Sequence, residues 1–228
     1  MKFLLIFLFP FTLLSQTFGT HIQSVYKECG LENHLSYSVF YVGMVGYYNL
    51  LGERKITGDK LIIVDYRQSS QQKRFYLINL TTPTLLFQTL VAHGRNSGKL
   101  YPVRFSNKKG SYKSSLGFYV TAESYYGTNG LSLNLDGLEK EYNSNARDRR
   151  IVLHGASYVN ADNMGRSLGC IVLPLTDIEK IITLIKDGNC LLVYTKQYTG
   201  RYLNIESAKQ YYYTLLSGKK VDEFFKEE

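Results

Sequence analysis

The chain has 228 residues, of which 44% are hydrophobic and 20% charged, so a disordered chain is excluded and one folded domain with a real core is expected. Its formal net charge of +8 would suit nucleic acid, an anionic membrane or an acidic polymer, but the Lys and Arg residues are scattered in short groups. Twenty Tyr and twelve Phe residues, with no Trp, favour a strand-rich fold.

The N-terminus has the pattern of a secretory signal peptide. Lys2 precedes an apolar run over residues 3–14, which is too short to span a bilayer. Thr17 and Gly19 are small residues placed as before a cleavage site, so we expect residues 1–19 to be removed. The alternative is an uncleaved anchor. Export to the periplasm or cell envelope argues against a nucleic-acid partner, and cleavage would leave no stable membrane anchor.

Residues 20–58 are expected to form an N-terminal helical appendage, because apolar residues such as Leu35, Val39 and Val42 recur at roughly helical spacing. Gly46 and Gly52 weaken the later part of this prediction. The turn at residues 57–59 would end the segment.

Residues 59–196 change to short strand-like runs, at 61–66, 74–80, 85–93, 117–122, 150–156 and 190–195. A long stretch at 94–117 has the composition of a functional loop. Residues 176–188 are predicted to form a helix that begins at a Thr176 cap and ends at Gly188. One face of this helix would carry Ile178, Ile181, Ile182 and Ile185. Residues 197–228 form a tail with a second helix at 208–216. Strands in series predict a mainly antiparallel β-barrel or β-sandwich with added helices.

Three cysteines, Cys29, Cys170 and Cys190, leave an unpaired thiol in an exported protein. A disulfide between Cys29 and Cys190 would leave Cys170 as the free thiol. The sequence does not test this pairing.

The segment from Ile151 to Pro174 carries the strongest chemical signal. His154 follows a strand, and a turn of the form Ser167-x-Gly169-Cys170 precedes another apolar strand. A cysteine nucleophile needs a base, usually His, and backbone N–H donors for the developing oxyanion, which a glycine-containing turn can present. Taken alone, a core cysteine and a structural histidine explain the same residues.

The same segment resembles the murein L,D-transpeptidase catalytic domain family of the YkuD-like superfamily, which shares His-Gly, a loop and Ser/Thr-x-Gly-Cys. The similar stretches span roughly residues 30–195 and are VAHGRNSG (91–98), RFSN (104–107), SSLGFYVT (114–121), GLSLNLDGLE (130–139), RIVLHGASYV (150–159) and GRSLGC (165–170). The resemblance implies an L,D-transpeptidase-like fold.

The resemblance also implies roles for single residues. Cys170 matches the nucleophile and His154 the general base, while Ser167 and Gly169 match the turn that shapes the oxyanion hole. Expected substrate-binding residues are Arg166, His93 and Gly155. Arg166 would bind a substrate carboxylate, with a surface salt bridge as the alternative, and His93 would line the site, with a structural histidine as the alternative.

Two departures from better-known members put substrate contacts in doubt. Leu168 stands where a His is usual, and Val172 stands where Arg or Asn is frequent.

The implied activity is a cysteine acyl transfer on peptidoglycan stem peptides. A thioester on Cys170 would form with loss of D-Ala from a tetrapeptide stem, and an amine would resolve it into a 3–3 crosslink or an exchanged terminal residue. The alternatives are an L,D-carboxypeptidase on the same stems and an inactive wall-binding protein. No cofactor is expected, and no cluster of His, Cys and carboxylate residues predicts a metal site.

Overall fold

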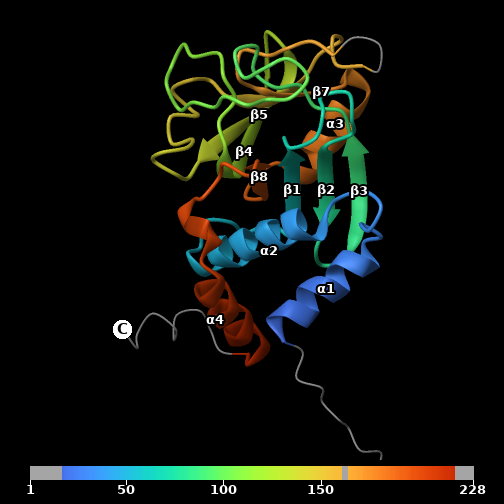
Figure 1. Cartoon of the computed structure of the whole chain (residues 1–228), viewed down its shortest axis with the longest axis vertical. Helices are drawn as coiled ribbons and strands as arrows, with labels where there is room; N and C mark the ends of the chain where they lie inside the picture. The colour runs from blue at the N-terminus through green and yellow to red at the C-terminus, as the bar shows by residue number, and fades with distance from the viewer. Residues whose placement is uncertain (1–16, 161–163, 219–228) are drawn as a thin grey trace, which may run out of the picture.

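The computed structural model describes residues 17–160 and 164–218. The expected signal peptide therefore lies almost wholly outside the described residues; Phe18 and Gly19 already belong to the first helix, α1. The described helices and strands form one sheet with four α-helices and a short 3-10 helix around it (Figure 1).

Eight strands form a single mixed sheet with the order β3-β2-β1-β8-β4-β5-β6-β7. Their bounds are Lys60–Asp65 (β1), Phe75–Asn79 (β2), Thr84–Thr89 (β3), Gly117–Gly127 (β4), Gly130–Gly137 (β5), Val152–Gly155 (β6), Ile171–Leu173 (β7) and Cys190–Tyr194 (β8). Among the described residues, five strand pairings are antiparallel, and β1–β8 and β6–β7 are parallel.

The sheet curls until its two ends almost meet. Ala92, three residues after β3, forms an antiparallel bridge with Val172 of β7, and the Ala92 N–H donates to the Val172 carbonyl at 2.9 Å. This contact confirms the expected barrel-like, mainly antiparallel fold. The strand predicted at 85–93 is shorter in the structure, where β3 ends at Thr89 and is followed by two isolated bridges, Ala92 with Val172 and Gly94 with Ser167.

Strand β5 was not expected as a strand, although Leu131, Leu133 and Leu135 alternate with polar residues as in a half-buried strand. It pairs with β4 on one side and with β6 on the other. It therefore connects the centre of the sheet to the strand that carries His154.

The N-terminal segment contains two helices rather than one continuous helical stretch, α1 (Phe18–Glu28) and α2 (Tyr37–Gly52). Gly30, with φ of +63°, follows the end of α1 and adopts the left-handed conformation common after helices. Helix α2 is apolar around most of its circumference and packs against the sheet.

The glycines of α2 mark close packing rather than weak helix. A Cβ on Gly46 would lie 1.9 Å from Cζ of Phe118 in β4, and a Cβ on Gly43 would lie 2.9 Å from Cδ1 of Ile63 in β1. Glycine is therefore required at position 46 by the approach of the helix backbone to the sheet, which outweighs its low helix propensity. At position 43 the end of the Ile63 side chain would have to shift to admit a Cβ.

Helix α3 (Leu175–Ile185) buries Ile178, Ile181, Ile182 and Ile185, as predicted from their spacing. The predicted Thr176 cap is wrong: the N-cap residue is Pro174, and the Thr176 hydroxyl donates to the Asp177 carboxylate instead.

The C-terminal segment forms the 3-10 helix η1 (Arg201–Leu203) and helix α4 (Ile205–Leu216). The Asn49 side chain of α2 donates to the carbonyls of Tyr202 and Asn204 at 2.9 Å and ties the two segments together. Figure 1 shows α1, α2 and α4 gathered at one end of the molecule and the long loops at the other.

The disulfide hypothesis is contradicted by the structure. Cys29 follows the last turn of α1 and Cys190 begins the central strand β8, and both are buried free thiols. Over residues 17–160 and 164–218, no helix is long and apolar enough to cross a membrane.

Candidate active site

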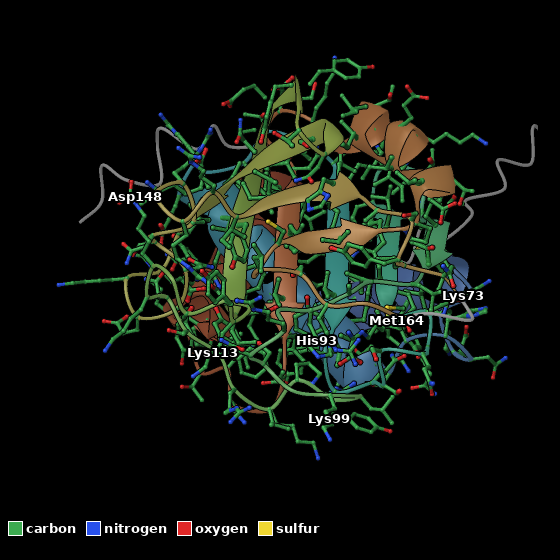
Figure 2. The ribbon with its side chains drawn as sticks, turned by 90° about the horizontal axis from the view of Figure 1, so that it is seen from above. Lys73, His93, Lys99, Lys113, Asp148 and Met164 are labelled. Atoms are coloured by element: carbon green, nitrogen blue, oxygen red, sulfur yellow. The ribbon has the colours of Figure 1, made fainter. Side chains whose placement is uncertain are left out.

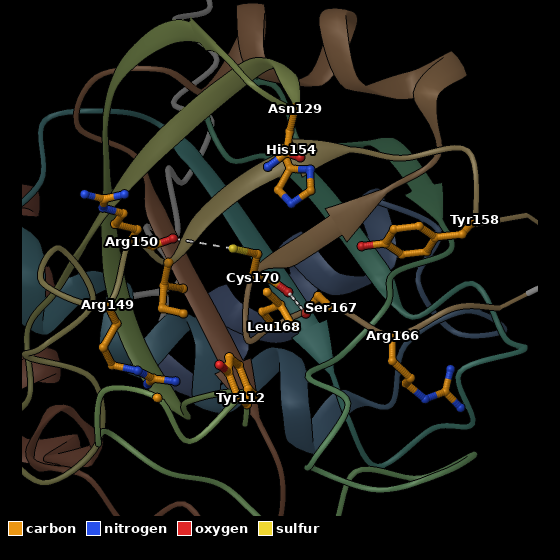
Figure 3. Close-up of a pocket in the computed structure, with 12 residues that line it drawn as sticks. Tyr112, Asn129, Arg149, Arg150, His154, Tyr158, Arg166, Ser167, Leu168 and Cys170 are labelled. Carbon is orange, nitrogen blue, oxygen red and sulfur yellow. Dashed lines mark hydrogen bonds between the residues drawn. The ribbon is translucent and has the colours of Figure 1, made fainter.

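Cys170 and His154 open into one cavity of about 480 Å³ at the loop-rich end of the sheet (Figure 3). The lining is rich in arginine and aromatic side chains and contains no Asp or Glu among the described residues. It consists of Gly110, Tyr112, Asn129, Arg149, Arg150, Ile151, His154, Tyr158, Arg166, Ser167, Leu168 and Cys170. The size and the convergent polar groups are those of a small-ligand site.

The pairing of β6 with β7 brings the two candidate catalytic residues together. His154 is in register with Val172, and Leu153 with Ile171, so Cys170 comes opposite Val152 just before β7 begins. Side chains two residues apart along a strand share a face, which makes His154 and Cys170 diagonal neighbours across adjacent strands. The fifteen-residue connection between β6 and β7 (156–170) is thus closed by a parallel strand pair.

The turn before Cys170 is held by the Ser167 side chain. Its hydroxyl donates to the Cys170 carbonyl at 2.8 Å and accepts from the Gly169 N–H at 3.1 Å. Gly169 has φ of +125°, and a Cβ there would lie 2.9 Å from Cδ1 of Ile151 and 3.0 Å from the Lys113 carbonyl. Glycine is therefore required by both backbone conformation and space.

The Cys170 thiol is partly exposed and donates to the Arg150 carbonyl at 3.5 Å. Arg150 has φ of +54°, a left-handed conformation that directs this carbonyl toward the sulfur. Burial raises the pKa of Cys170 above its usual value, while the Val152 N–H and the Arg149 charge act in the lowering direction. The resting form is the thiol rather than the thiolate.

His154 presents a neutral imidazole to the cavity. Its Nδ1 lies 3.0 Å from the Gly155 carbonyl, which only accepts, so Nδ1 carries the proton and Nε2 has a free lone pair. Burial lowers the pKa of His154. A neutral imidazole with an open Nε2 has the protonation state of a general base. In Figure 3 the ring lies above Cys170 and faces it, without a direct hydrogen bond drawn between them.

Gly155 does not face the cavity. It is buried, and a Cβ there would lie 3.0 Å from side-chain atoms of Leu175 and Ile178 in α3. This side of Gly155 therefore packs on α3, while its carbonyl orients His154. The substrate contact at Gly155 stays a prediction.

His93 lies behind the site rather than in it. The side chain has no exposed surface, its Nδ1 accepts from Nη2 of the equally buried Arg74 at 2.9 Å, and its Nε2 donates to the Gly98 carbonyl at 3.1 Å. Burial and the Arg74 charge lower the pKa of His93 to about 3. In Figure 2, a view from above, His93 lies nearer the middle of the molecule than Lys99, which is at the edge. The prediction that His93 lines the site is therefore wrong.

Arg166 lines the cavity, but its guanidinium is turned away from Cys170 (Figure 3). It donates to the carbonyls of Met164 at 2.7 Å and Gly165 at 2.9 Å, and also to that of Lys99. These contacts join the turn before Cys170 to the 94–117 loop. A carboxylate contact by Arg166 would require the guanidinium to leave some of these carbonyls.

Several cavity residues were not predicted from the sequence, namely Tyr112, Asn129, Arg149, Arg150 and Tyr158. For the two arginines, the available signal was their place just before β6, because residues at one end of a strand lie close to those at the same end of its parallel neighbour. Within the described residues, no group of three or more His, Cys, Asp or Glu side chains is arranged to hold a metal.

Comparison with known proteins identifies the family of this chain. The family described as YkuD_2, L,D-transpeptidase catalytic domain, matches residues 31–194. No curated protein sequence matches the chain.

Three solved structures that are similar to this chain each have low sequence identity to it. The helical cell shape determining protein Pgp2 of Campylobacter jejuni, as a K307A mutant, shares 15% identity (TM-score 0.43, 77% of this chain and 64% of that chain). Bd1075 of Bdellovibrio bacteriovorus shares 15% (TM-score 0.41, 70% and 56%) and an L,D-transpeptidase of Mycobacterium smegmatis 11% (TM-score 0.39, 60% and 59%). The chain thus covers less than two thirds of each of these three solved chains. By its match over residues 31–194, the chain belongs to the L,D-transpeptidase catalytic domain family.

Proposed function

We propose that this protein is a peptidoglycan L,D-transpeptidase in which Cys170 is the nucleophile and His154 the general base. The observation that carries the proposal is their arrangement: a partly exposed thiol and a neutral imidazole with a free Nε2 line one cavity from adjacent strands. Family membership supports the same class of reaction.

In the first half-reaction, a tetrapeptide stem is the acyl donor. The Cys170 thiol leaves the Arg150 carbonyl, and His154 Nε2 takes its proton. The thiolate attacks the carbonyl carbon at the L-centre of the third residue, a diamino acid. The oxyanion accepts hydrogen bonds from backbone N–H groups of the turn held by Ser167, and the N–H of Cys170 is the one we expect to contribute.

Collapse of this intermediate breaks the peptide bond to D-Ala. The leaving amine takes the proton from the His154 imidazolium, and the acyl group remains on Cys170 as a thioester. In the second half-reaction, an amine of a neighbouring stem attacks the thioester while His154 accepts its proton. The C–S bond breaks, the thiol is restored, and a 3–3 crosslink forms. If a free D-amino acid attacks instead, the terminal residue is exchanged; if water attacks, the enzyme is an L,D-carboxypeptidase.

The charge of the cavity supports a stem-peptide substrate. Arg149, Arg150 and Arg166 line it, and the described lining contains no acidic side chain. Stem peptides carry several carboxylates, which guanidinium groups bind through paired hydrogen bonds. The same argument applies to transpeptidation and carboxypeptidation, so charge does not separate these two activities.

We further propose that residues 1–19 direct export and that the protein works in the periplasm or cell envelope. Residues 59–196 would form the catalytic body, residues 20–58 a helical appendage, and residues 197–228 a partly helical tail. The packing of α2 through Gly43 and Gly46 supports a role for the appendage in stabilising the body.

The test is incubation of the purified protein and of its Cys170→Ala variant with tetrapeptide muropeptides, followed by mass spectrometry of the products. A dimer that has lost D-Ala and requires Cys170 would establish transpeptidation. A tripeptide monomer that requires Cys170 would assign carboxypeptidation. If the folded protein gives no Cys170-dependent product, the proposal fails and a wall-binding role is favoured.

A further inference from the structure

Arg149 occupies an unusual position at the wall of the cavity. Its guanidinium is half-buried and donates only to uncharged oxygens. Nη1 donates to the Ser106 carbonyl at 2.6 Å and to the Ser115 hydroxyl, and Nη2 donates to the Lys113 carbonyl at 2.6 Å and the Ser111 hydroxyl at 3.3 Å. Within the described part of the chain no carboxylate pairs with it. The positive charge is therefore fixed in place but not neutralised.

This charge lies directly behind the catalytic turn. A Cβ placed on Gly169 would lie 3.3 Å from Nη2 of Arg149, so the guanidinium packs against the residue that precedes Cys170. Arg149 and Cys170 also line the same cavity (Figure 3). Partial burial lowers the local dielectric constant, so a fixed positive charge in the wall of the cavity interacts more strongly with an anion in the cavity than it would in water.

Arg147, two residues earlier, provides a built-in contrast. It is exposed and pairs with two carboxylates, those of Glu123 at 2.6 Å and of Asp136. The loop thus contains one arginine whose charge is neutralised at the surface and one whose charge is available to the cavity.

We propose that Arg149 is a positioning residue whose uncompensated guanidinium favours the thiolate form of Cys170 over the thiol. The inference rests on the proposed function in taking Cys170 as the nucleophile. Burial opposes ionisation of the Cys170 thiol, but attack on the substrate requires the thiolate. The fixed charge of Arg149 would offset part of this effect of burial. The lowering effect of Arg149 on the pKa of Cys170 has the same direction.

Other ionisable groups line the same cavity or interact electrostatically with Cys170. One lies on β6, two lie in the loops before and after β6, one directly follows β1, and one lies in the turn before Cys170. They are His154, Arg150, Tyr158, Tyr66 and Arg166. His154 is neutral at pH 7 because burial lowers its pKa, and burial raises the pKa of both tyrosines. Arg166 points away and is bound to carbonyls, so Arg149 is the fixed cation packed against the turn.

The experiment measures the rate at which iodoacetamide alkylates Cys170 over about pH 6 to 10, by mass spectrometry of the peptide that contains it. The proteins are wild type, Arg149→Gln, Arg149→Lys and the control Arg147→Gln, with folding checked by circular dichroism. We expect the apparent pKa to rise by about one unit in Arg149→Gln, which lowers the rate at pH 7 about tenfold. Arg149→Lys and Arg147→Gln should stay within about threefold of wild type.

A folded Arg149→Gln variant with an unchanged pH profile overturns the proposal. If that variant does not fold, Arg149→Lys decides, because a lysine keeps the positive charge but not the fork of donors. A lower melting temperature with an unchanged pH profile of Cys170 alkylation supports the proposal. A pH profile shifted by about one unit refutes it. Alkylation needs no muropeptide, so this result stands apart from the transpeptidation assay. A shifted profile without turnover in wild type would support the role of Arg149 while the proposed function fails.

Discussion

The main-chain carbonyl of His93 accepts a hydrogen bond of 3.0 Å from the N–H of Ser167, the residue that holds the catalytic turn. The side chain of the same histidine is fixed by Arg74 and by the Gly98 carbonyl. His93 therefore supports the turn from behind, through its backbone, while its imidazole stays buried and neutral. Its protonation is expected to affect the fold before it affects the chemistry.

The first prediction concerns stability in acid. The pKa of His93 is about 3 in the folded state and near 6.5 when unfolded, so between these values the unfolded chain binds a proton that the native state does not. The contribution is fully present above pH 6.5 and is lost as the pH falls toward 3, by about 1.4 kcal/mol of unfolding free energy per pH unit. Urea unfolding of wild type and His93→Gln at a series of pH values measures how the free energy of unfolding changes with pH. Glutamine cannot take up the proton, so the slope should be smaller in the variant; equal slopes would contradict the assignment.

The second prediction concerns Ser167→Ala. Alanine removes the hydroxyl that donates to the Cys170 carbonyl and accepts from the Gly169 N–H, so we expect a loss of about 1–3 kcal/mol in unfolding free energy. Turnover of muropeptides should fall while Cys170 is still alkylated, since the thiol itself remains. Ser157→Ala, also in the loop between β6 and β7, is the control. A variant as active as wild type would mean that the turn does not need this hydroxyl.

The third prediction concerns Gly169→Ala. The added methyl group meets Ile151 and the Lys113 carbonyl at about the closest distances that atoms tolerate, at a φ of +125° that L-residues rarely adopt. We expect a cost of roughly 1–3 kcal/mol and loss of Cys170-dependent product. Gly110→Ala, also at positive φ but with open space around the new methyl group, separates the two causes. Equal stability losses in both variants would show that backbone conformation alone matters.

The fourth prediction concerns the three cysteines. Cys29 and Cys190 are buried, and burial raises the pKa of Cys29 to about 11 and that of Cys190 further, so neither presents a reactive thiolate. In native protein, an alkylating reagent at mildly alkaline pH should therefore modify Cys170 alone. Peptide mapping identifies the labelled residue, and all three should react in urea. Rapid labelling of Cys29 or Cys190 in the native state would contradict the structure.

The local chemistry of the site could be predicted from short sequence patterns. The Ser167-x-Gly169-Cys170 turn and the histidine at a strand end are local features, and the spacing of isoleucines in α3 is a periodicity within one element. The barrel-like, mainly antiparallel character also followed from the series of strand-like runs. These predictions needed only residues that are close in the chain.

The remaining features depend on contacts between distant segments. By propensity alone Gly46 weakens α2, but Phe118, seventy-two residues later, occupies the space that a side chain at position 46 would need. His93 was predicted to line the site, but Arg74 and the Ser167 turn enclose it. Arg149 could not be assigned to the site from the sequence, because the four oxygens that hold it lie on the 94–117 loop, which no local pattern connects to it.

The bridge between Ala92 and Val172 has a consequence for how the protein acquires its activity. Strand β7 is three residues long, with β6 on one edge and the bridge to Ala92 on the other. Its position therefore depends on Ala92, which lies eighty residues before Val172 in the chain. Closing such a long loop costs entropy that is recovered only when both edges are in place. We therefore expect Cys170 to reach its final position as a late event in folding, so that a partly folded chain would carry a cysteine that is not yet placed beside His154.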